Sequence, residues 1–162
     1  MIQIRPIEYH EINEAKLVIF TVAYKVFKEA GTLEESIAKY SAQGKLNEMD
    51  DVRKNYFDNG GTFLVTVKDN VIIGTGAIRY LEAGVCELKR MWLLTEYHGQ
   101  GLGYRMMQKL FSVAREKGYE FMRLETDRVV QYQAVHFYMR QGFYKIHPYG
   151  DDPDGMAMEV RL

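Results

Sequence analysis

Apolar side chains recur at helical spacing in the first part of the chain. From about His10 to Ala30, the residues that come at three- and four-residue steps are Ile12, Ala15, Ile19, Val22, Val26 and Ala30. This spacing predicts a helix with one buried face. Thr32 and Glu35 have the spacing of a helix capping box, so we expect a second helix to begin there and to end near Gly44. A third, short helical segment is expected from Leu46 to Tyr56.

After Gly60-Gly61 the apolar residues recur at every second position, which is the period of a β-strand. Phe63, Val65 and Val67 occupy alternate positions and Asp69-Asn70 marks a tight turn, so Val71 to Tyr80 is expected to return as the second strand of a hairpin. Further strands are expected at Ile2 to Ile7, Val85 to Leu94, Phe121 to Thr126, Phe143 to Ile146 and Met156 to Arg161, and further helices at Gly101 to Lys117 and Gln131 to Gln141. This order predicts an α+β fold, with a mixed sheet and helices on its faces.

The composition is that of an ordinary globular domain, with 162 residues, 47% of them hydrophobic and 27% charged. The sequence has no repeat, linker or low-complexity tract, so we interpret residues 1–162 as a single domain. A chain of this length buries enough apolar surface to fold without disulfides or a structural metal. Cys86 is the one cysteine and cannot form an internal bridge, which favours a reducing compartment.

The overall charge balance argues against nucleic acid or an anionic membrane as a partner, although it leaves a local basic patch open. The chain has 21 Lys and Arg against 22 Asp and Glu, so its net charge of −1 gives no general reason to bind nucleic acid or an anionic membrane. The longest apolar run, Leu17 to Tyr24, is too short to span a bilayer, and the N-terminus lacks the basic-then-apolar layout of a signal peptide. We therefore expect a cytoplasmic protein. The same apolar run, together with exposed strand edges, leaves a homodimer open.

The most informative segment is a glycine-rich turn between a strand and a helix, Leu93 to Tyr104. Gly99, Gly101 and Gly103 allow a ligand to approach the backbone closely, and their amides lie where the helix dipole is positive. The turn is therefore suited to an anion such as a pyrophosphate, although the glycines alone also fit a simple tight turn. It is not a P-loop, because Gly103 is followed by Tyr104 rather than by Lys and Ser or Thr, and its glycine spacing differs from the dinucleotide fingerprint.

Two stretches of sequence together resemble the GNAT N-acetyltransferase superfamily. Glu87-Leu88-Lys89-Arg90-Met91-Trp92-Leu93 followed by His98-Gly99-Gln100-Gly101-Leu102-Gly103 is similar to the central acetyl-CoA motif of that family. The spacing of its second half is reproduced by Ala134, Tyr138, Gly142 and Phe143. The resemblance implies the GNAT fold, a mixed and mostly antiparallel central sheet flanked by helices on both faces.

The resemblance also implies where acetyl-CoA binds. Backbone groups of Met91 and Leu93 are expected to pair with the pantetheine arm, with Trp92 between them. The pyrophosphate is expected to be held by the amides of Gly99, Gln100, Gly101, Leu102, Gly103 and Tyr104. Two further candidate contacts depart from the family pattern: His98 replaces a Gln or Arg, and Gln131 replaces an asparagine.

Tyr138 matches the tyrosine that protonates the departing coenzyme A thiolate in many members of the family. The alternative is that Tyr138 is a half-buried aromatic residue that anchors its helix. The candidate donor to the developing oxyanion is the backbone N–H near Met91 or Trp92.

Two carboxylates are candidates for the base that deprotonates the amine, Glu87 and Glu125. Glu87 is expected on the same side of its strand as Lys89 and Met91 and is the preferred candidate. Glu125 lies near the end of the next strand. The alternative that Glu87 serves as a cross-strand ion pair stays open, with the possible partners Lys89, Arg90 and Arg123.

The cysteine, the histidines and an acidic loop are not assigned to the catalytic chemistry. No His or Asp lies near Cys86 in the sequence at a position that suggests a catalytic base. Cys86 is therefore interpreted as a small buried hydrophobic residue rather than a nucleophile. No metal is predicted, because no metal-ligand spacing joins His10, His98, His136 and His147. An acidic loop is interpreted as a solvated turn, with attraction of a cationic amine as the alternative: Asp151, Asp152 and Asp154. Candidates to line an acceptor pocket are Tyr24 and Phe27, or Tyr144 and Tyr149.

The leading functional hypothesis is an acetyl-CoA-dependent N-acetyltransferase. It would transfer the acetyl group to a primary amine of a small molecule or peptide by direct attack in a ternary complex. The alternative is a non-catalytic acyl-CoA-binding sensor, which the departures at His98 and Gln131 favour. A generic phosphate-binding α+β protein is the third hypothesis.

Overall fold

The computed structural model describes residues 1–127 and 132–162, so Gln131 lies outside the described residues. In this part of the chain the strands are β1 (Ile2–Pro6), β2 (Thr62–Lys68), β3 (Val71–Glu82), β4 (Val85–Leu93), β5 (Phe121–Asp127), β6 (Tyr144–Ile146) and β7 (Gly155–Arg161). The α-helices are α1 (Ile12–Val26), α2 (Leu33–Ala42), α3 (Leu102–Glu116) and α4 (Tyr132–Arg140). Short helical turns are η1 (Tyr9–Glu11), η2 (Asn47–Asp51), η3 (Arg53–Phe57) and η4 (Thr95–Tyr97).

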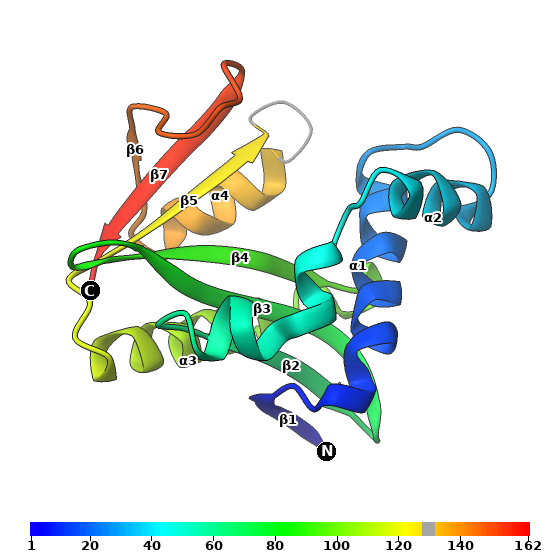
Figure 1. The fold of residues 1–162 in the computed structure, drawn as a ribbon, viewed down its shortest axis with the longest axis horizontal. Helices are drawn as coiled ribbons and strands as arrows, with labels where there is room; N and C mark the ends of the chain where they lie inside the picture. The colour runs from blue at the N-terminus through cyan, green and yellow to red at the C-terminus, as the bar shows by residue number, and fades with distance from the viewer. Residues whose placement is uncertain (128–131) are drawn as a thin grey trace.

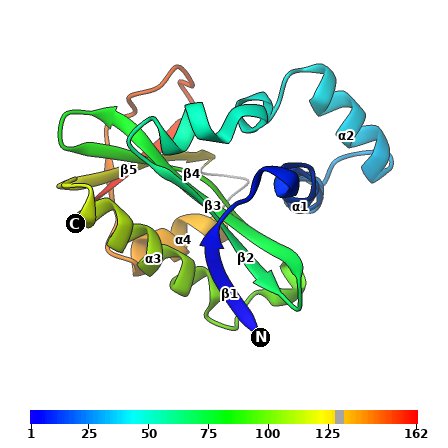
Figure 2. The same cartoon turned by 60° about the horizontal axis from the view of Figure 1, so that its bottom comes forward.

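The strands form one seven-stranded sheet in the order β1-β2-β3-β4-β5-β7-β6. Neighbouring strands are antiparallel except β4 and β5, which run parallel. Figure 2 shows α3 and α4 on one side of the sheet and α1 and α2 on the other. The prediction of a mixed, mostly antiparallel sheet with helices on both faces is confirmed.

Each face of the sheet carries its own hydrophobic core. The face covered by α3 and α4 includes Leu88, Met106, Leu110, Leu124 and Tyr138. The face covered by α1, η2 and η3 includes Ile19, Met49, Tyr56, Phe63 and Ala77. Successive strand residues point to opposite faces of the sheet. The core in which a residue of β4 or β5 packs therefore shows on which face its side chain lies.

The segment predicted as one short helix from Leu46 to Tyr56 forms two turns instead, η2 and the π-helical η3. Leu46 has a φ of +66°, which separates these turns from α2. Leu46, Met49, Val52 and Tyr56 are three or four residues apart and all are buried against the sheet. The segment is therefore helical, as predicted, but it consists of a 3₁₀ turn followed by a π-helical turn rather than one regular α-helix.

Helix α3 packs unusually close to the sheet at Gly76 of β3. A Cβ atom on Gly76 would lie 2.9 Å from Cγ of Met106 and 3.1 Å from Cδ1 of Leu110. The side chains of Met106 and Leu110 therefore occupy the space that a larger residue at Gly76 would need, so glycine allows the buried face of α3 to pack closely on the sheet. None of the helices in the described residues is long and apolar enough to cross a membrane.

Candidate active site

The parallel strands β4 and β5 pair only over their first residues. Their register runs from Val85 opposite Phe121 to Glu87 opposite Arg123, although β4 continues to Leu93 and β5 to Asp127. Figure 1 shows β5 diverging from β4 beyond this point. The diverging halves leave main-chain groups that an extended ligand can pair with as an added strand. We call this feature the β4–β5 opening.

A β-bulge lies in β4 beside the opening. Gly76 of β3 faces two residues of β4, Arg90 and Met91. Arg90 has a φ of +55°, in the left-handed region that a residue with a side chain rarely adopts. The hydroxyl of Thr75 donates a hydrogen bond of 2.7 Å to the carbonyl oxygen of Arg90. Bulges redirect backbone and side-chain groups, so this one sets the orientation of the main chain at Met91.

The bulge also corrects one expectation from the sequence. Met91 was expected on the same side as Glu87 and Lys89, yet it packs into the core on the α3 side, which contains Leu88. The extra residue at Arg90 shifts the alternation by one position, so Met91 faces the side opposite to Lys89.

A salt bridge links the bulge to η2. Arg90 Nε donates to Glu48 Oε1 at 2.6 Å, and a second guanidinium nitrogen of Arg90 contacts the same oxygen. The hydroxyl of the fully buried Tyr56 donates to Glu48 as well, at 3.3 Å. The strained residue of β4 is therefore held from both its carbonyl and its side chain. The sequence analysis did not find Glu48 or Thr75, because neither belongs to a local motif.

The glycine-rich turn has the geometry of an anion site. Gly99 and Gly101 both have a φ of +78°, and α3 begins at the next residue, Leu102. The first amide of this segment that bonds within the fold is that of Arg105, which donates to Gly101 O. Among the described residues, the amides from Gly99 to Tyr104 have no acceptor. They form a group of unpaired donors at the positive end of the α3 dipole, as a pyrophosphate site requires, and Gly99, Gln100, Gly101 and Tyr104 are exposed residues.

Two residues that precede the glycines of this turn make contacts of their own. Nε2 of His98 lies 2.8 Å from the carbonyl oxygen of Leu93, so the imidazole bonds to the end of β4. Trp92 packs against the core on the α1 side. His98 thus links the start of the glycine-rich segment to the end of β4, and Trp92 anchors that strand in the core.

Tyr138 of α4 lies on the α3 side of the opening. It is 7% exposed and packs in the same cluster as Leu88 and Leu124, which directly follow the last paired residues of β4 and β5. Burial raises the pKa of its phenol well above the ordinary value. No hydrogen bond joins its hydroxyl to another residue in the described part of the chain. Tyr138 is therefore a neutral phenol with a free proton at neutral pH.

Glu87 lies on the opposite face and both its oxygens are engaged. Oε1 accepts hydrogen bonds from Nε and an Nη atom of Arg79, at 3.2 and 3.0 Å, and Oε2 accepts one from the hydroxyl of Tyr149 at 2.8 Å. The ion-pair alternative for Glu87 is thus realised, with Arg79 of β3 as the partner rather than Lys89, Arg90 or Arg123. Arg79 and Glu87 are opposite each other in the hairpin around Gly84. Working out the register of this hairpin from the sequence would have identified Arg79 as the partner of Glu87.

Glu125 of β5 lies on the same face as Glu87, but its carboxylate is unpaired. It has no hydrogen bond or ion pair with another described residue. Burial raises the pKa of its carboxyl, and the charges of Glu87, Asp152 and Asp151 raise it further, while Lys89 lowers it. A Cβ on Gly150 would lie 2.2 Å from Glu125 Oε1, so the loop after β6 passes directly over this carboxylate.

The remaining candidates from the sequence fall outside the opening or have structural roles. Tyr24 donates to the carbonyl oxygen of Gly31, and Tyr144 donates to Glu159. Burial raises the pKa of the Cys86 thiol to about 12, so this cysteine is not a thiolate nucleophile. Within the described residues, no group of His, Cys, Asp or Glu is arranged to hold a metal ion.

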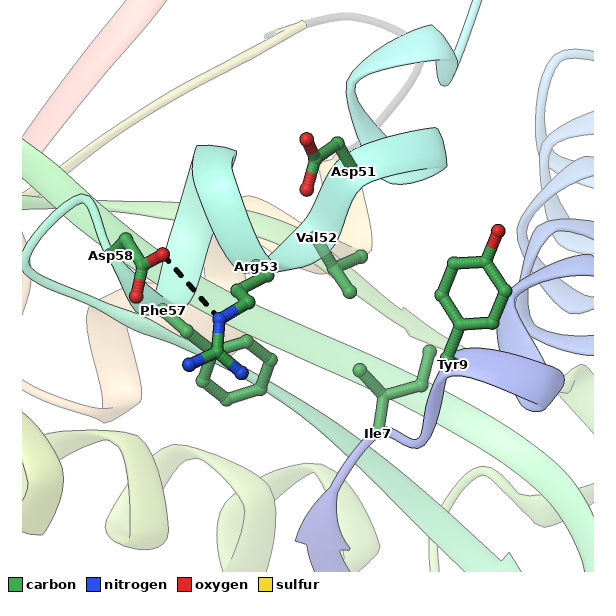
Figure 3. A pocket seen from close by; sticks show the side chains of 7 residues that line it. All are labelled: Ile7, Tyr9, Asp51, Val52, Arg53, Phe57 and Asp58. Carbon is green, nitrogen blue, oxygen red and sulfur yellow. Dashed lines mark ion pairs between the residues drawn. The ribbon is translucent and has the colours of Figure 1, made fainter.

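A pocket of about 360 Å³ lies away from the opening, beside β1, η2 and η3 (Figure 3). Its walls include Tyr9, Val52 and Phe57, and an ion pair of 3.6 Å between Arg53 and Asp58 lies on one side. None of the candidate residues from the sequence analysis lines it.

Comparisons with known proteins identify the family of this chain. A model described as the acetyltransferase (GNAT) family matches residues 30–143, which include the bulge, the glycine-rich turn and Tyr138. The chain is 35% identical over 104 residues to IAA acetyltransferase of Azospirillum brasilense, covering 62% of this chain and 67% of that protein. It is 27% identical over 117 residues to probable N-acetyltransferase family 8 member 5 of Mus musculus, covering 69% of this chain. The match spans about half, 51%, of that mouse protein.

Solved structures share the fold over the whole chain. An acetyltransferase of the GNAT family from Staphylococcus aureus Mu50 has a TM-score of 0.82 at 19% identity, covering 100% of this chain and 99% of that one. PaiA N-acetyltransferase of Thermoplasma acidophilum, solved in complex with coenzyme A, has a TM-score of 0.79 at 21% identity, with coverage of 100% and 99%.

Proposed function

The chain belongs to the GNAT family of acetyl-CoA-dependent N-acetyltransferases, and from this premise we propose that it transfers the acetyl group to a primary amine by direct attack in a ternary complex. The observation that carries the proposal is the arrangement of groups around the β4–β5 opening. A phenol with a free proton, Tyr138, lies on one face of the sheet, and an unpaired carboxylate, Glu125, lies on the other. A thioester placed in the opening therefore has an acid on one side and a base on the other.

The residues of this chain fit acetyl-CoA. The unpaired amides from Gly99 to Tyr104 suit its pyrophosphate, and the unpaired edge of β4 beyond Glu87 suits its pantetheine arm. The thioester supplies the activated acetyl group. In the proposed reaction, the amide N–H at Met91 or Trp92, redirected by the bulge, stabilises the oxyanion that develops on the carbonyl. Tyr138 donates its proton to the departing thiolate.

We assign the role of base to Glu125 rather than to Glu87. A base needs a free oxygen to accept the proton, and both oxygens of Glu87 already accept hydrogen bonds, from Arg79 and from Tyr149. Glu125 has a raised pKa and free oxygens, which make proton uptake easier. Glu87 then acts as a positioning residue, because it fixes Tyr149 and the loop that passes over Glu125.

The proposal is tested by incubating the protein with acetyl-CoA and a panel of amines while free thiol release is recorded. Wild-type protein is expected to release thiol in an amine-dependent manner, with an acetylated product visible by mass spectrometry. Acetyl-CoA binding measured by calorimetry, without product for any amine, would instead identify an acyl-CoA-binding sensor and overturn the enzymatic proposal.

A further inference from the structure

Lys89 occupies a special position at the β4–β5 opening. It lies two residues beyond the last residue of β4 that pairs with β5, and directly before the bulge. Its partner across the hairpin is Ala77, which belongs to the core on the α1 side, so Lys89 lies on the face of Glu87 and Glu125. This is the face from which an amine reaches the thioester in the proposed reaction.

Most of the charged side chains around Lys89 are already paired. Glu87 is bound by Arg79, Glu48 is bound by Arg90, and Arg123 is bound by Glu82 and Glu159. On this face, in the part of the chain that the structure describes, Lys89 and Glu125 are the half-buried charged residues that form no ion pair and no hydrogen bond. They do not pair with each other either, since no contact of 4 Å or less joins them.

An unpaired, half-buried lysine is costly for the fold. Burial lowers the pKa of Lys89, and the nearby charges of Arg90 and Arg79 lower it further, while Glu87 and Glu48 raise it. A negatively charged partner compensates for this lost hydration best, because it offers both charge and hydrogen-bond acceptors. The coenzyme does not provide one, because its anion site is at the start of α3 and Tyr138 lies on the other face of the sheet.

We propose that the acceptor of this enzyme is an amino carboxylate, a molecule with a carboxylate as well as the primary amine that is acetylated. The carboxylate binds Nζ of Lys89, and the ammonium group approaches Glu125, which removes its proton before attack. The two unpaired charges at the opening have opposite signs and match the two ends of such a zwitterion. Asp151 and Asp152, on the exposed loop near Glu125, add to the attraction at the ammonium end. The inference rests on the proposed function and specifies its substrate class.

The test compares amines that differ only in the carboxylate. Glycine, β-alanine and γ-aminobutyrate are each paired with the alkylamine of the same carbon chain, and kcat and KM are measured by thiol release. Wild-type enzyme is expected to prefer the best amino carboxylate over its alkylamine by about tenfold or more in kcat/KM, the value of a hydrogen-bonded charge pair. Lys89→Met is expected to lose this preference through KM, with kcat for alkylamines retained. Lys89→Glu is expected to favour diamines, and Lys89→Arg to keep part of the preference.

A matched control is Lys117→Met, at the exposed end of α3, which is expected to change neither constant. Thermal unfolding of each variant separates loss of fold from loss of recognition. Equal kcat/KM for amino carboxylates and alkylamines in the wild type would overturn the substrate class and leave the acetyltransferase proposal standing. An equal loss by Lys89→Met on both kinds of acceptor would also overturn it. If the wild type acetylates no member of the panel, the proposed function fails together with the inference.

Discussion

The hydroxyl of Thr75 donates a hydrogen bond of 2.7 Å to the carbonyl oxygen of Arg90, the residue at the left-handed position of the β4 bulge. Thr75 is 1% exposed, so this bond is shielded from water. It ties the strand next to the opening to the point where the main chain of β4 changes direction. The orientation of the proposed oxyanion donor therefore depends on a side chain in the neighbouring strand.

Replacing Thr75 by valine is expected to lower kcat about tenfold and stability by about 1 kcal/mol, because the buried carbonyl of Arg90 loses its donor. The KM for acetyl-CoA is expected to change little, since the phosphate site lies elsewhere. Steady-state kinetics and chemical denaturation measure both effects. Thr75→Ser keeps the hydroxyl and is expected to retain most of kcat; an equal loss in the serine variant would contradict a role for this hydrogen bond.

The left-handed backbone at Arg90 predicts that glycine is tolerated better than alanine at this position. Arg90→Gly and Arg90→Ala both remove the ion pair with Glu48, but glycine adopts a φ of +55° without the strain that alanine carries. Arg90→Gly is therefore expected to be more stable than Arg90→Ala by about 1 kcal/mol and to keep the higher kcat. Thermal denaturation and thiol-release kinetics compare the pair. The opposite order would show that the bulge does not keep its conformation in the variants.

Tyr138→Phe tests the proposed acid. The substitution removes the hydroxyl but preserves the ring that packs against Phe143 and Phe137. We expect kcat to fall about one hundredfold, while the Kd for acetyl-CoA and the melting temperature stay close to wild type. Calorimetric titration with acetyl-CoA supplies the binding measurement. A kcat within twofold of wild type would assign Tyr138 to packing alone.

Glu125→Gln is expected to lower kcat and at the same time stabilise the fold at neutral pH. The pKa of Glu125 is raised above 4.5 in the folded state, so its contribution to stability is fully present at low pH and is lost as the pH rises through the raised pKa. At pH 7 the ionised carboxylate is therefore unfavourable in the fold, and glutamine removes that penalty. Unfolding curves below pH 4 and at pH 7 are expected to show the stabilisation at pH 7 and not at the acidic pH.

Glu87→Gln is the comparison for this variant. Because Arg79 and Tyr149 hold the buried Glu87, losing its charge leaves the half-buried guanidinium of Arg79 without its ion-pair partner. This variant is expected to be destabilised at pH 7, the opposite sign from Glu125→Gln. If the two variants change stability in the same direction, the distinction between a held carboxylate and a free one is wrong.

Gly101 and Gly118 provide a matched pair at the two ends of α3. Their φ angles are +78° and +86°, and a Cβ atom on either would meet nothing within 4 Å. Alanine at both positions is therefore expected to cost similar stability, about 1 kcal/mol. Only Gly101→Ala is expected to weaken coenzyme A binding, by about tenfold, because it disturbs the amides of the anion site. Similar Kd values for the two variants would argue against a phosphate at this turn.

The sequence by itself predicted most of the helices and strands of this protein and pointed to the glycine-rich turn as its candidate anion site. The periodicity of the apolar residues specified the helices and strands, and the glycine-rich turn could be identified because its amides, its glycines and the start of α3 are adjacent in the chain. The two halves of the family motif were likewise local. The sequence did not determine the side of β4 on which Met91 lies, since the bulge that moves it depends on pairing with β3.

Only the tertiary structure decided which carboxylate is free. Arg79 and Tyr149 reach Glu87 from a neighbouring strand and from a loop 62 residues later, and these contacts leave Glu125 as the unpaired carboxylate. The same is true of Lys89, whose lack of a partner follows from ion pairs that its neighbours form with distant residues. A local pattern specifies which chemical groups are present, whereas their protonation and availability depend on neighbours that the fold brings together from far along the chain.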